Sequence, residues 1–312
     1  MKAREAPPEP LEVWALLGYA VAALYVLLLV YLGLRPGGKG PLFAWGRGRD
    51  LLQLAALALL VTGAIWSFLH RPVLRRGRRI PFFLLALVIG AGSYPFPYPS
   101  SHEGHPSAVH FRLPIEREWT VFWGGEAKEE NLLVAYSAER RFGLDLVVAK
   151  AGVTHSGEGR AAADFFCFGA PVLAPADGKV VRAVGDQADG TPGVIDRSAP
   201  RLGNHVVMEV APGEFVFLAH LQQGSLAVKE GDVLRAGDAI GRAGASGWSS
   251  MTPEPHLAIH LQDSPDPRSG EPIPWRFFDY TADGVRVDKG VPRGGIGPGG
   301  ALRGQKVAPL PR

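Results

Sequence analysis

The strongest constraint on this chain is a pair of long apolar runs near its N-terminus that carry no charged residue. The first, Val13–Leu34, has 22 residues, and the second, Leu51–Leu69, has 19. A helix needs about 20 apolar residues to cross the roughly 30 Å hydrocarbon core of a bilayer. Helices of soluble bundles keep a polar face, and no small-residue cleavage site follows the first run. The sequence therefore predicts two membrane-spanning helices rather than a cleaved signal peptide.

A third apolar run, at about residues 80–94, is shorter and fits either a short span or a re-entrant segment; we favour a span. Basic loops tend to stay in the cytoplasm. The loop before this run holds Arg71, Arg75, Arg76, Arg78 and Arg79. We therefore expect a multi-pass anchor of about three helices over residues 1–94, with the C-terminal part of the chain extracytoplasmic. The basic residues of the first loop, which would then face outward, weigh against this topology.

Composition excludes several classes of function. The formal net charge is only +3, and the C-terminal half shows no basic stripe with interleaved aromatic residues, so nucleic acid is not an expected partner. Cys167 is the single cysteine, which rules out an intrachain disulfide and a thiolate zinc cluster. The chain holds 40 glycines and 27 prolines, a content that suits a turn-rich β protein.

The C-terminal part alternates short apolar runs with turn residues, and no helical period of useful length appears in it. We expect strands at Leu144–Lys150, Lys179–Val184, His205–Val210, Phe215–Leu221, Ala239–Arg242 and His256–Gln262. The pattern predicts an all-β fold, an antiparallel two-sheet sandwich or barrel-like domain, over residues 115–283. Before it, residues 95–114 indicate a Pro-rich linker, and after it residues 284–312 indicate a disordered, basic Gly/Pro tail.

Six motifs in the β-domain follow one another in an order typical of one family. They are APADGKVV at 174–181, GNHVV at 203–207, AHL at 219–221, VKEGDVLRAGDAIG at 228–241, GASG at 244–247 and PHL at 255–257. Upstream, WTVFWGG at 119–125 and FGLD at 142–145 match a membrane-linked branch of it. The β-domain therefore resembles the lysostaphin-type (LytM-type) zinc metallopeptidases, which cleave peptides of the bacterial cell wall. The resemblance does not extend to the anchor.

This resemblance implies a set of site residues. Members of the family hold zinc with the His and Asp of an H-x-x-x-D motif and with the second His of a late H-x-H motif. Asp145 matches the Asp ligand, and His220 and His256 match two catalytic histidines that do not bind the metal. The other two ligand positions are lost, because Arg141 and Ala258 occupy them. Neither a guanidinium nor a methyl group can donate a lone pair to zinc.

Two readings of the altered site follow. His260 is a candidate substitute ligand, but it lies a strand step of about 6.6–6.8 Å beyond Ala258 and would need a bulge to reach the metal. Alternatively, the Arg141 guanidinium replaces the ion and pairs with Asp145, unless Arg141 points to solvent.

The sequence therefore predicts a membrane-anchored protein of the bacterial envelope with a degenerate zinc site. We expect it to bind peptidoglycan or a cell-wall hydrolase without cutting, with zinc absent or weakly bound. One alternative is an active zinc metalloendopeptidase that cleaves peptidoglycan peptides with an unusual ligand set. The other is a carrier or sugar-binding module of related fold, because lipoyl carriers share glycine-punctuated hairpins. The sequence names neither the peptide bond nor the partner nor the oligomeric state.

Overall fold

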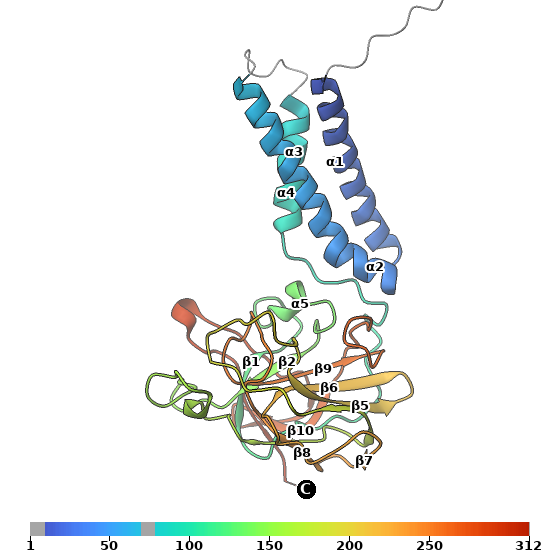
Figure 1. The fold of residues 1–312 in the computed structure, drawn as a ribbon. Coiled ribbons are helices and arrows are strands. Elements are labelled where there is room, and N and C mark those ends of the chain that lie inside the picture. Colours follow the sequence, from blue (N-terminus) through green and yellow to red (C-terminus); the bar gives the residue numbers. More distant parts are fainter. Residues whose placement is uncertain (1–9, 70–78, 312) are drawn as a thin grey trace, which may run out of the picture. The chain divides into compact units, whose positions relative to one another are not determined.

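The computed structural model describes residues 10–69 and 79–311, and its contacts divide the chain into two compact units (Figure 1). The first unit is helical and ends at Pro99, and the second begins at Ser100 and contains the strands.

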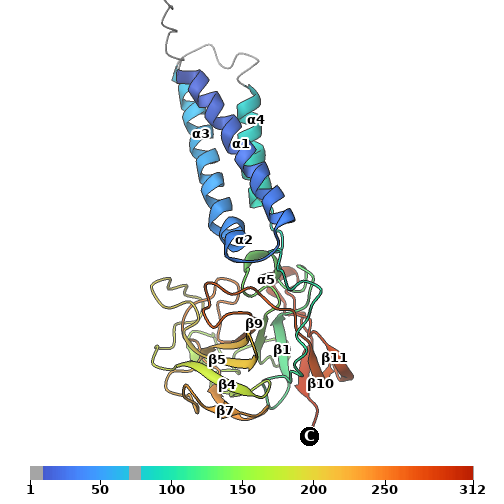
Figure 2. The same ribbon diagram turned by 90° about the vertical axis from the view of Figure 1, so that its right-hand side faces the viewer.

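The helical unit packs three helices against one another. Its elements are α1 (Pro10–Leu34), α2 (Lys39–Phe43), a π-helical turn (Ala44–Gly48), α3 (Arg49–Leu69) and α4 (Arg79–Ser93). Helices α1, α3 and α4 lie side by side in both views of the ribbon (Figure 2). Trp14 on α1 donates its indole N–H to the carbonyl of Leu59 at 2.7 Å. A side chain at Gly63 would overlap this indole, since its Cβ would lie 2.4 Å from Trp14 Cζ2.

Two helical segments are long and apolar enough to cross a membrane by length and composition, Val13–Leu34 and Lys39–Leu69. The expectation of about three spans is corrected, because α4 has only 15 residues. At 1.5 Å per residue it extends about 22 Å, short of the roughly 30 Å hydrocarbon core. Four of the five arginines used to orient the anchor (71, 75, 76 and 78) lie outside the described residues.

The second unit is a mostly antiparallel β-domain, and all six strands expected from the sequence are present. Among the described residues, ten strands form one sheet in the order β11-β10-β12-β1-β2-β9-β6-β5-β4-β7. These strands are β1 (Trp119–Trp123), β2 (Leu144–Val147), β4 (Gly178–Val184), β5 (Asn204–Ala211), β6 (Glu214–Leu221), β7 (Val233–Leu234), β9 (Leu257–Gln262), β10 (Phe277–Ala282), β11 (Val285–Gly290) and β12 (Lys306–Pro309). The sandwich of two sheets is corrected to one large sheet plus the pair β3 (Pro171–Leu173) and β8 (Ala239–Arg242).

A few short helices complete the domain, namely α5 (Leu133–Tyr136) and 3₁₀ turns at Ala162–Asp164 and Pro298–Gly300. The centre of the sheet carries the core. Every residue of β9 is buried, and its neighbours β2 and β6 are almost wholly so. Burial on both faces explains why these strands read as nearly continuous apolar runs. A polar side chain on β2 or β9 is therefore enclosed and needs a partner.

The chain ends are more ordered than their composition predicts. Strand β12 lies between β10 and β1, pairing Trp119 with Val307 and Tyr280 with Pro309. The predicted disordered tail is thus wrong for residues 284–311, since a Gly/Pro-rich segment still forms a strand where two neighbours offer unpaired backbone groups. The predicted linker over 95–114 is also too long, because Phe111 and Leu113 are buried in the β-domain core.

Val307 gives a test of this end of the sheet. Its side chain is fully buried, so Val307→Ala should lower the free energy of unfolding by about 2 kcal/mol. Val285→Ala is the matched control, since Val285 lies on the edge strand β11 with 68% of its surface exposed and should give no measurable change. Urea unfolding of the purified chain followed by tryptophan fluorescence measures both. Equal values for the two variants would contradict the placement of β12.

Candidate functional site

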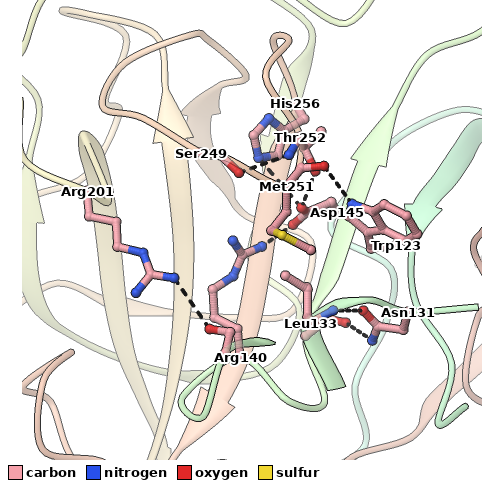
Figure 3. A network of polar contacts seen from close by, with 12 residues as sticks. Trp123, Asn131, Leu133, Arg140, Asp145, Arg201, Ser249, Met251, Thr252 and His256 are labelled. Carbon is pink, nitrogen blue, oxygen red and sulfur yellow. Dashed lines mark hydrogen bonds and ion pairs between the residues drawn. The ribbon is translucent and has the colours of Figure 1, made fainter. Parts of the chain in front are cut away.

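Asp145 lies at the centre of the site because β2 is enclosed between β1 and β9. Its neighbours across the two strand pairs are Trp123 and Ala258, and its carboxylate is fully buried. The Thr252 hydroxyl donates to Asp145 Oδ2 at 2.6 Å, and the Arg140 guanidinium contacts Oδ1 directly (Figure 3). The carboxylate is therefore held by an ion pair and a hydrogen bond inside the sheet.

The arginine at Asp145 is Arg140, and the expected pairing of Arg141 with Asp145 is wrong. Arg141 turns the other way and makes two hydrogen bonds to the Glu103 carboxylate, at 2.5 and 3.0 Å. A turn closed by Gly143 N–H on the Arg140 carbonyl, at 2.8 Å, precedes β2 and gives adjacent side chains different directions. In the H-x-x-x-D motif the residue four positions before the Asp faces it. The turn before β2 directs Arg141, the residue at that position, toward Glu103 instead.

His220 and His256 lie together beside Asp145, as the resemblance implied. Their ring centroids are 4.5 Å apart, and His256 Nε2 lies 3.8 Å from Asp145 Oδ2. His220 sits near the end of β6 with a φ of 61°, at a register shift between β5 and β6 that takes it out of the strand alternation. His256 directly precedes β9. The chain thus brings three of the predicted residues into one cluster.

Backbone carbonyls orient both rings. His220 Nδ1 lies 2.8 Å from the Ser246 carbonyl oxygen, and His256 Nδ1 lies 2.6 Å from that of Glu254. A carbonyl oxygen only accepts hydrogen bonds, so each Nδ1 carries the proton and donates it. In the neutral ring, each Nε2 is then a hydrogen-bond acceptor.

Electrostatics keep the carboxylate charged and the imidazoles neutral. Burial alone would raise the pKa of the Asp145 carboxyl, but Arg140, His256 and the Thr252 hydroxyl together hold that pKa below its usual value. Burial, followed by electrostatic coupling to the neighbouring His256 and the Arg140 charge, holds the pKa of His220 well below the ordinary value. Burial also lowers the pKa of His256 by more than Asp145 raises it.

A pocket opens beside the two histidines. Besides His220 and His256, its wall includes Thr191, Trp248 and Glu254. The loop that carries Thr252 forms the side next to Asp145, and Trp123 holds it by donating its indole N–H to the Met251 carbonyl at 2.9 Å (Figure 3). The histidine side of the cluster therefore borders the pocket, while Asp145 is enclosed.

The residues present do not fit the zinc site of the resembled family. Ala258 supplies no donor, and a guanidinium contacts the one retained ligand position, Asp145. His260 is stacked on Phe217, with ring centroids 4.6 Å apart and an angle of 13° between planes. Within residues 10–69 and 79–311, no three His, Cys, Asp or Glu side chains are grouped so as to hold a metal ion.

Sequence reasoning missed three residues of the site, Arg140, Thr252 and Glu254. All three stand next to positions that were singled out: Arg140 precedes Arg141, and the other two lie just before the PHL motif. Their closeness in the sequence to these positions was the one signal that indicated them. Which of the two arginines reaches Asp145 is decided by the geometry of the turn before β2.

The ion pair yields a stability prediction. Arg140→Met should lower the free energy of unfolding by about 3–5 kcal/mol, because it leaves the Asp145 carboxylate buried without a counter-charge. The double variant Arg140→Met/Asp145→Leu should regain most of that loss, since both charges are then absent. Arg286→Met, which breaks the exposed pair with Asp288, is the control and should have no measurable effect. A single variant as stable as wild type would show that Asp145 does not depend on Arg140.

His260 yields a pH prediction. Burial, with a further contribution from the Arg140 charge, holds the pKa of His260 well below its ordinary value of about 6.5. Its neutral form therefore stabilises the fold above about pH 6.5, and this contribution is lost as the pH falls below that value. His260→Phe keeps a ring on Phe217, so the variant should lose less stability than wild type between about pH 7 and pH 5. Urea unfolding at both pH values measures this, and identical losses would contradict it.

Comparison with known proteins adds independent information. Residues 158–270 match the model of peptidase family M23. No curated protein sequence matches the chain. Among solved structures, the catalytic domain of lysostaphin from Staphylococcus simulans is 23% identical, with 42% of this chain and 73% of that chain covered and a TM-score of 0.27.

Two further structures are similar. A zinc-containing peptidase from Vibrio cholerae is 20% identical, with a TM-score of 0.30, and the alignment covers 59% of this chain and 39% of that one. A complex of SpoIIIAH and SpoIIQ gives 18% identity over 57% of this chain and 96% of that chain, with a TM-score of 0.32. With the family match, the ordered motifs and the β-domain in agreement, residues 158–270 form a peptidase family M23 domain of the lysostaphin type.

Proposed function

We propose that this chain is a membrane-anchored, non-catalytic member of family M23 whose β-domain lies outside the cytoplasm. It binds peptidoglycan peptides or a cell-wall hydrolase without cutting a bond. The observation that carries the proposal is the contact between the Arg140 guanidinium and the buried Asp145 carboxylate.

The chemistry of zinc hydrolysis supports this reading. A catalytic zinc site uses three protein ligands and an open position, where the metal lowers the pKa of a bound water to about 7. Here one ligand position holds Ala258, another holds Arg141, and Asp145 is engaged by Arg140 and Thr252. A permanent cation beside the remaining carboxylate also repels a divalent metal ion.

The pocket supports a binding role. His220 and His256 are held in place by backbone carbonyls and line a pocket with Trp248. A site without metal keeps these contacts for a ligand, although it cannot activate water. Loss of hydrolysis therefore does not require loss of recognition.

The helical unit supports a location of this chain at the membrane. Its segments Val13–Leu34 and Lys39–Leu69 meet the length and hydropathy of membrane spans. Peptidoglycan lies outside the cytoplasmic membrane, so a β-domain that recognises it has to be exported.

Zinc content is the first test. The full chain, purified in detergent and given zinc before gel filtration, should retain far less than one equivalent and should not cleave peptidoglycan peptides. Elemental analysis and a hydrolysis assay on the same sample measure both. Near-equimolar zinc together with cleavage would instead establish an active metalloendopeptidase with an unusual ligand set.

Restoring the ligands is the matched gain-of-function test. The variant Arg141→His/Ala258→His adds two donors, and adding Arg140→Ser to it also removes the competing cation. Zinc uptake should be largest in the triple variant, because only there is Asp145 free to bind the metal. If the double variant already equals the triple variant, Arg140 does not block the site. Cleavage by the triple variant additionally requires groups that orient the new ligands.

Membrane topology is tested with reporters fused after the last residue, since strands continue to Pro309. Alkaline phosphatase, which needs export, should be active in this fusion, and a cytoplasmic fluorescent protein should be dark. The opposite result would place the β-domain in the cytoplasm and remove the cell-wall role.

A further inference from the structure

The pocket beside the histidine pair has an unusual polarity. His220 and His256 are 4% and 3% exposed, and both rings line it. Because each Nδ1 donates to a backbone carbonyl, each neutral ring presents only an acceptor, Nε2, to its surroundings. Among the described residues, His256 Nε2 is buried without a hydrogen-bond partner. Its nearest carboxylate oxygen, Asp145 Oδ2 at 3.8 Å, is itself an acceptor.

Glu254 adds a third acceptor to the same wall. One of its oxygens, Oε2, accepts a hydrogen bond from the Thr154 hydroxyl at 3.0 Å. The other, Oε1, is buried and has no hydrogen-bond partner among the described residues. Buried acceptors without donors are costly, at about 1–3 kcal/mol each, so a ligand that supplies donors here gains affinity.

The charge around the pocket points the same way. Asp145 is paired with Arg140, and Arg201 is paired with Glu139 at 2.6 Å. Glu254 has no ion-pair partner within 4.0 Å among the described residues, and burial raises the pKa of its carboxyl, so a cation at the pocket wall would stabilise the ionised form. A positively charged donor group is therefore favoured over a neutral one.

We propose that this pocket binds a protonated primary amine carried by a peptide, through His220 Nε2, His256 Nε2 and Glu254 Oε1. An ammonium group has three N–H donors and can satisfy three acceptors, whereas a backbone amide has one. The inference rests on the proposed function, since it names the group that a non-catalytic pocket recognises in its peptide ligand. A hydrolytic site would instead direct donors at the carbonyl of a scissile bond.

The tautomers are the first test. The full chain in detergent, labelled with ¹⁵N-histidine, should show His220 and His256 protonated at Nδ1 and unprotonated at Nε2 at pH 8. Long-range ¹H–¹⁵N spectra distinguish the two ring nitrogens, and His220→Phe and His256→Phe assign the signals. A proton on Nε2 of His256 would overturn the proposal, because that nitrogen would then be a donor.

Binding is measured with a matched pair of probes. One is the capped tripeptide acetyl-Gly-Lys-Gly-amide, and the other is the same peptide with the lysine amine acetylated. The first should shift the two Nε2 signals, and the acetylated peptide should bind at least about tenfold more weakly, because it lacks the charge and two of the three donors. Equal affinity for the two peptides would overturn the proposal.

Variants locate the site. Glu254→Gln keeps the shape and the contact with Thr154 but removes the charge, and it should weaken binding of the lysine peptide by about tenfold. Glu158→Gln, at an exposed glutamate paired with Arg160, is the control and should bind like wild type. Loss of binding in both variants, or in neither, would contradict the assignment of Glu254.

Purified sacculi separate this inference from the proposed function. If the chain binds sacculi equally well before and after their amines are acetylated, the amine site is wrong and the proposed function stands. If the chain binds the lysine peptide but no sacculi, the amine site stands and the cell-wall role is wrong.

Discussion

The buried contact between Arg140 and Asp145 is the interaction on which the rest of the site depends. An ionised carboxylate in the middle of a sheet carries a desolvation cost of several kcal/mol, which has to be offset by a counter-charge and hydrogen bonds. Arg140 supplies the charge and Thr252 the hydrogen bond. The turn before β2 and the loop that carries Thr252 are thereby fixed against the same atoms.

This arrangement explains how the domain keeps the histidine pair in place although the residues at the zinc positions do not fit the metal. Arg140 and Thr252 stabilise the Asp145 carboxylate, and they also occupy the two oxygens that would bind a metal ion. His220 and His256 remain in place because their Nδ1 atoms are held by the carbonyls of Ser246 and Glu254, which do not depend on a metal. The result is a cluster of acceptors beside a pocket, a polarity suited to cationic donors.

The sheet includes a C-terminal segment whose Gly/Pro-rich composition predicts disorder. β12 fills the position between β10 and β1, and β1 in turn lies against β2 and the site. Near the start of the second unit, which begins at Ser100, Glu103 pairs with Arg141. Arg141, which occupies a lost ligand position, therefore anchors the first residues of the β-domain. The ordered ends therefore support the same strands that carry Asp145.

The sequence by itself determined the apolar helices, the antiparallel β-domain and the cluster of Asp145, His220 and His256. These follow from signals that are local or set by ordered motifs: uncharged runs such as Val13–Leu34, alternating strands, and AHL and PHL in order. Tertiary structure decided the rest. It alone chose Arg140 over Arg141, because a turn and not a residue count sets the direction of each side chain. It also brought Lys306–Pro309 into the sheet, because backbone pairing between distant segments can outweigh a composition that favours disorder.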